Sequence, residues 1–504
     1  MKKSSLVIIY HRQPYEEVVE DGKTVLREHA SPNGIVPTLK SFFGMVDHCA
    51  WVAWKQIDPR RTQGFEPVVR IEDSYGSYVV SRLGLTAQQV RSFYHVTSKE
   101  ALWPILHSFP ERYDYDPVDW PTFQEVNRLF AEAAAEQAAE GAMVWVHDYN
   151  LWLVPKYLKA LRPDVHVAFF HHTPFPAPNI FNILPWREEI IDSLLLCDLV
   201  GFHIPRYAVN FVHVARSLRN ARPDEEIAVE PGLSPHGLAL SEPTIPQCLS
   251  YEGRTILIDA FPVGTNTDHI QEVVQRPDTL ALEERIRGEL NGRRLIISIG
   301  RSDYTKGTRD LLLAYERLLE RRPELHGNVQ LLVTSVAAAK GMRVYRAVQR
   351  EIEQLSGQIN GRFATLGWQP LLLFTNAIPF DELIAWYRCA DVCWITPLRD
   401  GLNLVAKEYV AARKGMNGAL VLSEFTGASV ELRGAILTNP YSARNMNAAI
   451  DKALDMPEEE QRVRMESLWD SVDHYDAQAW TMHTLQLFRR ICASEPIASA
   501  ATAP

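Results

Sequence analysis

Leu295-Ile-Ile-Ser-Ile299-Gly-Arg-Ser-Asp-Tyr-Thr-Lys306-Gly-Thr308 is the stretch of sequence that decides the fold. Its apolar run, Leu295–Ile299, is typical of a buried strand. Gly300 then introduces a turn, and a helix is predicted from Arg309 to Leu319. A strand, a glycine turn and a helix in this order form the repeating unit of open α/β sheets. Such sheets bind ligands at the carboxyl ends of their strands.

The turn of this unit carries two basic residues, Arg301 and Lys306. The amide groups at the start of the following helix have no intrahelical partners and lie at the positive end of the helix dipole. Two cations beside such a helix start could hold a diphosphate and stabilise the charge of a leaving phosphate. The alternative is a surface loop with two solvated bases.

The same alternation of apolar runs and helical patterns continues through the chain. Continuous apolar strands separated by helices indicate parallel sheets that are covered on both faces, so we predict an α/β fold of two such units joined near residues 261–264. The expected strands are Leu6–Tyr10, Ala50–Trp54, Met143–Val146, His166–Phe170, Leu199–His203, Thr255–Ile258, Leu295–Ile299, Gln330–Thr334, Val392–Thr396 and Ala419–Leu422. Further expected helices are Val344–Leu355, Asp381–Arg388 and Leu404–Arg413. The Ala/Glu-rich stretch Ala131–Ala142 is expected to form a solvent-facing helix.

Composition limits the possible functions. The chain has 504 residues, of which 46% are apolar and 23% charged, as in an ordinary globular protein of two or three domains. Its net charge of −10 argues against a broad basic face for nucleic acid, but small anionic substrates remain possible. No run approaches the roughly 20 apolar residues of a membrane span. The early apolar run Leu6–Tyr10 is too short for a signal peptide, and six scattered cysteines suit a reducing compartment, so we expect a cytoplasmic protein.

A second strand–turn–helix segment, Thr396-Pro-Leu-Arg-Asp400-Gly-Leu-Asn-Leu-Val-Ala-Lys-Glu408, carries two carboxylates. Gly401 allows the backbone to approach a ligand closely, and the amides from Leu402 to Val405 would face it. Carboxylates suit sugar hydroxyls better than phosphate, which they repel. The alternative is that Asp400 caps the helix and Glu408 is an ordinary helical residue.

Polar residues also end the strands of the first half. His147 and Asp148 follow one predicted strand, and His171 and His172 end the next, which indicates one wall of a cleft. A single histidine in such a place is more often structural. Arg12, after the first strand, and the turn at Asn33-Gly34 could together reach a bound phosphate, although a plain strand-to-helix connection would look the same.

Two patterns resemble metal sites only weakly. Cys389 and Cys393 are four residues apart, but no second Cys/His pair follows at zinc spacing, so two buried thiols are the simpler interpretation. Asp114 and Asp116 have the D-x-D spacing of metal-dependent sugar transferases, but they follow no predicted strand. We therefore expect a loop there and no essential metal or other cofactor.

Taken together, four strings resemble the trehalose-6-phosphate synthase family of retaining glycosyltransferases. They are His147-Asp-Tyr149, Phe169-Phe-His-His-Thr-Pro-Phe-Pro176, Arg301-Ser-Asp-Tyr-Thr-Lys306-Gly307 and Pro397-Leu-Arg-Asp-Gly-Leu-Asn-Leu-Val-Ala-Lys-Glu408. The similarity runs from about residue 5 to 490. It implies two facing Rossmann-like domains (the GT-B architecture) with the active site in the cleft between them.

The resemblance also implies domain limits. Residues 1–262 would form the acceptor-side domain, joined by a C-terminal helix at about 476–493. Residues 263–475 would form the nucleotide-sugar domain, and 494–504 a flexible tail. Within the family, the strings Tyr10-His-Arg-Gln-Pro-Tyr15, Ser31–Phe43 and Val96–Pro104 are most similar to the glucosylglycerol-phosphate synthases. That branch transfers glucose from ADP-glucose to glycerol 3-phosphate in compatible-solute synthesis, which implies a separate phosphatase that acts on the product.

Residue roles follow from the resemblance position by position. Arg301 and Lys306 would hold the donor diphosphate, and Arg12 and Gly34 would close over the phosphates. The donor sugar and ribose would contact His172, Asp400, Gly401, Leu402, Asn403, Leu404, Val405 and Glu408. Tyr94, Trp103 and Asp148 would line the acceptor side. Arg301, Lys306, His172 and Asp148 are the residues that we expect to act in catalysis.

Two positions depart from the family pattern. A Gly-Gly pair of the family is Asn33-Gly34 here, and the arginine that grips the phosphate of glucose 6-phosphate is absent near Ala339. Lys340 or Arg343 would then bind the acceptor phosphate. This departure favours an acceptor other than glucose 6-phosphate. The alternatives are a trehalose-6-phosphate synthase and a silent sugar-nucleotide binder. In chemistry, the alternative to direct transfer with retention is a covalent adduct on Asp148.

Overall fold

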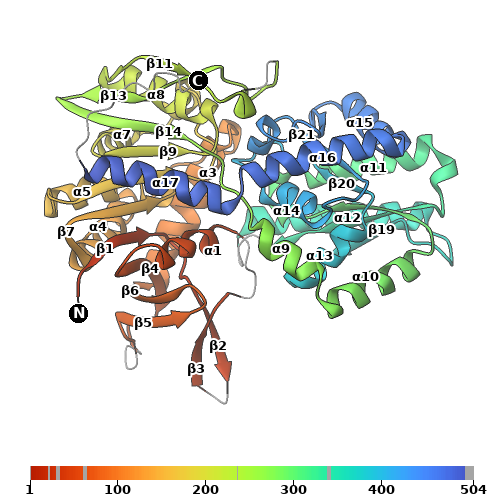
Figure 1. The fold of residues 1–504 in the computed structure, drawn as a ribbon, viewed down its shortest axis with the longest axis horizontal. Helices are drawn as coiled ribbons and strands as arrows, with labels where there is room; N and C mark the ends of the chain where they lie inside the picture. The colour runs from red at the N-terminus through yellow and green to blue at the C-terminus, as the bar shows by residue number, and fades with distance from the viewer. Residues whose placement is uncertain are drawn as a thin grey trace.

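The structure is a computed structural model that describes residues 2–20, 23–29, 34–60, 65–234, 237–337 and 342–493. Its described part contains two large sheets, one from each half of the chain, which form two α/β domains (Figure 1). The first sheet has the order β10 (Arg222–Pro223), β13 (Cys248–Tyr251), β14 (Arg254–Ala260), β9 (Leu199–Phe202), β8 (His166–His171), β7 (Ala138–His147), β1 (Ser4–Ile9), β4 (Cys49–Ile57), β6 (Gly76–Thr86) and β5 (Val68–Asp73).

The central strands of this sheet, from β14 to β6, are parallel, and antiparallel strands lie at both edges. The second sheet is entirely parallel. Its order is β19 (Leu371–Phe374), β17 (Val329–Thr334), β15 (Arg294–Ser298), β20 (Val392–Ile395), β21 (Ala419–Ser423) and β22 (Ile436–Thr438).

Helices cover both faces of the two sheets. Those of the first half include α1 (Ile35–Lys40), α4 (Trp120–Gln137), α5 (Val154–Leu161), α7 (Arg187–Leu194) and α8 (Pro205–Arg219). Those of the second half are α9 (Thr267–Val274), α10 (Pro277–Leu290), α11 (Thr308–Arg321), α12 (Arg343–Phe363), α13 (Phe380–Cys389), α14 (Leu404–Ala412), α15 (Ala443–Asp455) and α16 (Glu458–His474). No helix among the described residues is both long and apolar enough to cross a membrane.

The burial of β1 explains why the predicted strands are continuous apolar runs. Val7 and Ile9 pack in the core that contains α4, whereas Leu6 and Ile8 pack in the core on the opposite face. Successive side chains of a strand point to opposite faces, so a strand covered on both sides must be apolar throughout. All ten predicted strands and the four helices expected in the second half are confirmed, with ends shifted by at most eight residues.

The prediction for Ala131–Ala142 was wrong in two respects. Helix α4 ends at Gln137, and β7 begins at Ala138. Ala131 and Ala134 are fully buried against the sheet rather than exposed to solvent. Small side chains let a helix approach a sheet closely, and this packing outweighs a composition that is typical of exposed helices.

The last helix, α17 (Ala477–Cys492), packs on the first sheet although it follows the second in sequence (Figure 1). The Trp480 ring is buried and stacks on Trp145 of β7, with ring centroids 5.3 Å apart. Phe42 and Phe170 meet the same ring edge-on. The predicted tail, 494–504, lies outside the described residues. The predicted domain limits at 262–263 and 475–476 fall between β14 and α9 and between α16 and α17, and they stay a prediction.

Trp480→Ala is expected to lower the thermal midpoint strongly, because it leaves a cavity against Trp145 that costs about 3–5 kcal/mol. Met482→Ala, on the exposed face of the same helix, is the matched control and should change the midpoint little. Differential scanning calorimetry of the two variants measures the difference. Equal midpoints would show that α17 contributes no core to the first sheet.

Candidate functional site

A cavity of about 170 Å³ lies where the carboxyl ends of the two sheets face each other. The first half contributes residues that follow β1, β6, β7 and β8, and the second half contributes residues that follow β15 and β20. Its lining consists of Tyr10, His11, Arg12, Tyr94, Lys99, Trp103, His107, Asp148, Tyr149, Asn150, His172, Thr173, Pro174, Arg301, Lys306, Asp400 and Gly401. This is the edge at which open parallel sheets bind ligands.

The loop after β15 places the two predicted phosphate-binding cations. Arg301 begins a short strand, β16 (Arg301–Ser302), which pairs with β18 (Val336–Ala337). Asp303 then holds the turn, because its carboxylate accepts hydrogen bonds from the amide and the hydroxyl of Thr305, both at 3.0 Å. Lys306 ends this turn, so both cations reach the cavity from one rigid loop.

Lys306 is paired with Asp400 across the two strand ends. The ammonium nitrogen lies 2.8 Å from Asp400 Oδ2, and Asn403 donates its side-chain amide to the same oxygen at 3.0 Å. Burial alone would raise the pKa of Asp400, but Lys306 and Asn403 hold it below its ordinary value. Asn403 also caps α14 by accepting from the Ala406 amide, so one side chain fixes both the helix start and the carboxylate.

Gly401 is the point at which the two halves of the cavity meet. A Cβ atom on Gly401 would lie 2.3 Å from the carbonyl oxygen of His172, which no side chain can tolerate. On the other side, a Cβ atom on Gly427 would come equally close to the carbonyl oxygen of Gly401. Tyr207 of α8 adds a hydrogen bond of 3.0 Å from its hydroxyl to the Asp400 carbonyl. The two domains are therefore in direct backbone contact beside the cavity.

The wall formed by the first half is held in an unusual backbone conformation at Asp148. Its φ angle is 71°, a region that residues other than glycine rarely adopt, and its amide donates to the Phe170 carbonyl at 2.9 Å. Burial raises the pKa of Asp148 to about 6, while nearby Lys99 and the backbone amides oppose this effect. The carboxylate is therefore mostly ionised at neutral pH.

The histidines around this wall are neutral. His147 Nδ1 and His172 Nε2 lie 3.0 Å apart, and burial lowers the pKa of both well below the usual value. Burial also lowers the pKa of His107 and of His171 to about 4. At neutral pH these rings can donate or accept hydrogen bonds, but none carries the proton of a general acid.

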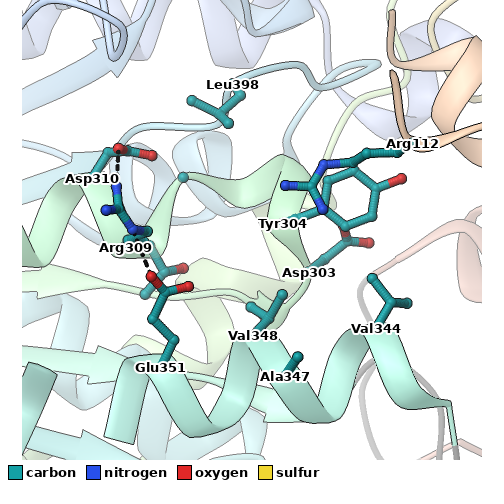
Figure 2. Close-up of a pocket in the computed structure, with 12 residues that line it drawn as sticks. Arg112, Asp303, Tyr304, Arg309, Asp310, Val344, Ala347, Val348, Glu351 and Leu398 are labelled. Carbon is teal, nitrogen blue, oxygen red and sulfur yellow. Dashed lines mark hydrogen bonds and ion pairs between the residues drawn. The ribbon is translucent and has the colours of Figure 1, made fainter. Parts of the chain in front are cut away.

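A larger cavity, of about 440 Å³, lies on the other side of the loop that carries Arg301 and Lys306 (Figure 2). Its Arg309 bridges Glu351 at 2.6 Å and Asp310 at 3.4 Å, and Arg112 lies over the Tyr304 ring. Three carboxylates (Asp303, Asp310 and Glu351) line this cavity against two arginines. Its charge therefore does not favour an anion, although its volume is greater.

Comparisons with known proteins agree with this geometry. Residues 4–490 match the family model described as Glycosyltransferase family 20. The chain belongs to this family. As a family-20 member, the protein is a glycosyltransferase enzyme with two facing Rossmann-like domains, which confirms the predicted fold class.

Its relatives carry two names. A glucosylglycerol-phosphate synthase of Synechocystis sp. is 54% identical over 98% of this chain and 99% of that protein. A trehalose-6-phosphate synthase of Mycobacterium sp. is 38% identical over 95% of this chain and 93% of that protein. Among solved structures, the trehalose-phosphate synthase of Burkholderia xenovorans in complex with glucose-6-phosphate has a TM-score of 0.81 at 27% identity, over 96% of this chain and 99% of that chain.

The cavity of this glycosyltransferase brings together most of the predicted site residues. These are Arg12, Tyr94, Trp103, Asp148, His172, Arg301, Lys306, Asp400 and Gly401. Leu402, Asn403, Leu404, Val405 and Glu408 continue from Gly401 along α14 but do not line the cavity, and neither does Gly34, at the start of α1. Lys340 and Asn33 lie outside the described residues, and α12 begins at Arg343. The ligand assigned to each residue stays a prediction.

Sequence analysis gave no role to several residues that line the cavity, above all Lys99. It lies on the π-helix Arg91–Leu102, which runs directly into Trp103. Lys99 is five residues after Tyr94 and four before Trp103, and the wider turn of the π-helix brings its ammonium over both rings. In an ordinary α-helix a five-residue spacing would turn Lys99 away from Tyr94, so the sequence carried no clear signal for this lysine.

The weak metal patterns have ordinary surroundings in this glycosyltransferase. Cys389 and Cys393 are buried, and burial raises the pKa of Cys389 to about 11. Asp114 accepts a hydrogen bond from the Asp116 amide in a loop. In the part of the chain that the structure describes, no three His, Cys, Asp or Glu residues are grouped as metal ligands. The prediction that catalysis needs no metal remains to be tested.

Gly401→Ala is expected to reduce turnover at least 100-fold, because its methyl group would push the His172 carbonyl and the first domain away from the cavity. Gly357→Ala is the matched control, since a Cβ at this position in α12 meets no atom within 4 Å. Initial rates and circular dichroism of both variants separate lost activity from lost folding. Full activity of a folded Gly401→Ala protein would contradict the backbone contact.

Glu408 gives a prediction about pH and stability. Its pKa is raised to about 8 by burial, and the Tyr387 hydroxyl that donates to it at 3.4 Å only partly offsets this. An unfolded glutamate titrates near 4.3, so between about pH 4.5 and pH 8 the native state keeps a proton that the unfolded state has lost. Raising the pH through this window therefore destabilises the wild type.

Glu408→Gln removes this titration. We expect its stability advantage over the wild type to be on the order of 3 kcal/mol larger at pH 8 than at pH 5. Thermal midpoints at several pH values measure the gap, and exposed Glu382→Gln controls for the loss of one carboxylate elsewhere. A gap that does not change with pH would show that Glu408 is not a protonated acid in the native state.

Proposed function

We propose that this protein transfers glucose from ADP-glucose to glycerol 3-phosphate with retention of the α configuration. The products are 2-O-(α-D-glucosyl)-glycerol 3-phosphate and ADP. The observation that carries the proposal is the cavity in which Arg301 and Lys306 of one domain face Asp148 and His172 of the other. The acceptor comes from the relatives: those that are 47–54% identical carry the name glucosylglycerol-phosphate synthase.

In this proposal, the cations that follow β15 bind the donor diphosphate. Arg301 has no carboxylate within ion-pair distance among the described residues, and Lys306 has one, Asp400. A bound diphosphate would share the Lys306 ammonium with Asp400, which in turn would accept hydrogen bonds from the glucose hydroxyls. The cations stabilise the charge that grows on the departing phosphate, and they would do so without a metal.

The acceptor hydroxyl then attacks from the face that the phosphate leaves. Its proton passes to the leaving phosphate oxygen, so the step needs no protein base. The lowered pKa values of the surrounding histidines support this route, because a ring with a low pKa is a weak base for the acceptor proton. The competing route, a covalent glucosyl ester on Asp148, predicts an adduct that mass spectrometry would detect.

Several consequences belong to the same proposal. The product retains the acceptor phosphate, so a separate phosphatase would be needed to release glucosylglycerol, a compatible solute (osmoprotectant) that cells accumulate under salt stress. The proposed location is the cytoplasm, where both substrates would be found. A silent sugar-nucleotide binder is disfavoured by the preserved Arg301, Lys306 and Asp400.

The test of the proposed function is a panel of donors and acceptors. ADP-glucose and UDP-glucose are each combined with glycerol 3-phosphate or glucose 6-phosphate, and release of the nucleoside diphosphate is measured. We expect turnover with ADP-glucose and glycerol 3-phosphate, and an α-linked product by proton NMR. Turnover only with glucose 6-phosphate would instead identify a trehalose-6-phosphate synthase, as in the relatives that are 36–38% identical.

Lys306→Ala is expected to lower kcat by about 10²–10³, because it removes a preorganised cation from the leaving phosphate. Exposed Lys414→Ala, in the loop after α14, is the matched control and should keep the wild-type rate. Steady-state kinetics with saturating donor measures both. Near-normal turnover of Lys306→Ala would rule out this role.

A further inference from the structure

Lys99 is the cation of the cavity that the proposed mechanism leaves without a role. Its ammonium lies 3.9 Å from the centroid of the Trp103 ring, 5.6 Å from that of Tyr94 and 5.7 Å from that of Tyr149. Three aromatic rings thus fix its position beside the cavity. Aromatic faces attract a cation, but they provide no counter-charge.

Lys99, which is half-buried, differs in this respect from two fully buried lysines of the described structure. Lys40 is paired with Asp73 at 2.6 Å, and Lys407 with Glu431 at 2.9 Å. Among the described residues, no carboxylate lies within 4.0 Å of Lys99. A half-buried charge without a partner carries a desolvation cost, which an anion bound beside it would offset.

The electrostatic surroundings of Lys99 agree with an anion site. Burial, followed by repulsion from Arg301, lowers the pKa of Lys99 to about 7, and Asp303 and Asp148 only partly oppose this. Trp103 and Tyr149 line the same cavity with their rings, whereas Trp103 Nε1 and the Tyr149 hydroxyl are fully buried and have no partner within the described ranges. A ligand with anionic oxygens would be matched by the Lys99 ammonium itself.

The position of Lys99 indicates which substrate carries this anion. Arg301 and Lys306 come from the second domain, whereas Lys99 comes from the first, on the same helix as Tyr94 and beside Trp103. The donor diphosphate is already matched by the loop after β15. The second phosphate present during the proposed reaction belongs to the acceptor, and Lys99 lies on that side.

We propose that Lys99 binds the phosphate group of the acceptor, an inference that rests on the proposed function. Through this contact the enzyme selects phosphorylated over unphosphorylated acceptors. The rings of Trp103 and Tyr149 hold the Lys99 ammonium in place for this contact. This assignment does not require Lys340 or Arg343 to replace the arginine that the family has near residue 339.

The test compares the wild type with Lys99→Met, which keeps the aliphatic chain among the three rings but removes the charge, and with Lys99→Arg, which keeps the charge. For Lys99→Met we expect the KM for glycerol 3-phosphate to rise about 10- to 100-fold, with kcat and the KM for ADP-glucose nearly unchanged. Lys99→Arg should recover part of the loss. Lys340→Met is the comparison variant, because the sequence analysis expected Lys340 or Arg343 to bind the acceptor phosphate.

Removing the phosphate from the substrate makes the test specific. With glycerol as the acceptor, kcat/KM of Lys99→Met should equal that of the wild type, because glycerol has no phosphate group for the Lys99 ammonium to bind. Equal losses with glycerol and glycerol 3-phosphate would overturn the proposal. So would a large effect of Lys340→Met together with none of Lys99→Met.

A binding measurement covers the case in which glycerol is turned over too slowly. Glycerol 3-phosphate is titrated into the enzyme–ADP complex by calorimetry, and we expect the same 10- to 100-fold loss for Lys99→Met. Unchanged affinity would refute the site. The thermal midpoint of the free variant should be equal to or above that of the wild type, because an unpaired enclosed charge has been removed, and this shows that the variant folds.

The two proposals can fail independently. If the wild type uses glucose 6-phosphate rather than glycerol 3-phosphate, the proposed function is wrong, and the same comparison of Lys99→Met with the wild type is made with glucose 6-phosphate and glucose. If the wild type uses glycerol 3-phosphate but Lys99→Met keeps its KM, only the assignment of Lys99 is wrong.

Discussion

The arrangement of the active cleft depends on one backbone contact, between Gly401 of the second domain and the His172 carbonyl of the first. It brings the carboxyl edges of two separate parallel sheets together, so groups that lie far apart in the sequence line one small cavity. Each edge alone would present an open, solvated set of loops. Their contact excludes water from between them and strengthens every electrostatic interaction inside.

Charge, rather than volume, distinguishes the two cavities beside the loop after β15. In the larger one, Arg309 is paired with two carboxylates. The smaller one holds four cations against two carboxylates, and of those cations only Lys306 has a carboxylate within ion-pair distance in the described structure. A reaction between a nucleotide sugar and a phosphorylated acceptor brings several negative charges into one place. An excess of fixed positive charge is what such a site requires.

The sequence predicted the strands well because strands that are buried on both faces must be apolar throughout, as in Leu295–Ile299. It predicted the loops that carry Arg301, Lys306, Asp400 and Gly401 for a related reason, since each directly follows such a run. It did not predict β6, whose polar residues break the apolar pattern. Nor did it predict the pairing of Lys306 with Asp400, or the place of Lys99, because these depend on how the strand ends meet in space.

The position of α17 also affects how the protein is made. Trp145 lies in the middle of the first sheet, yet the ring that covers it, Trp480, is more than 300 residues further along the chain. A ribosome therefore releases the ten strands of the first sheet well before it releases the helix that covers one of their faces. Until then the aromatic surface of β7 is open to other chains and to chaperones. In this molecule the domain that is synthesised first is completed last.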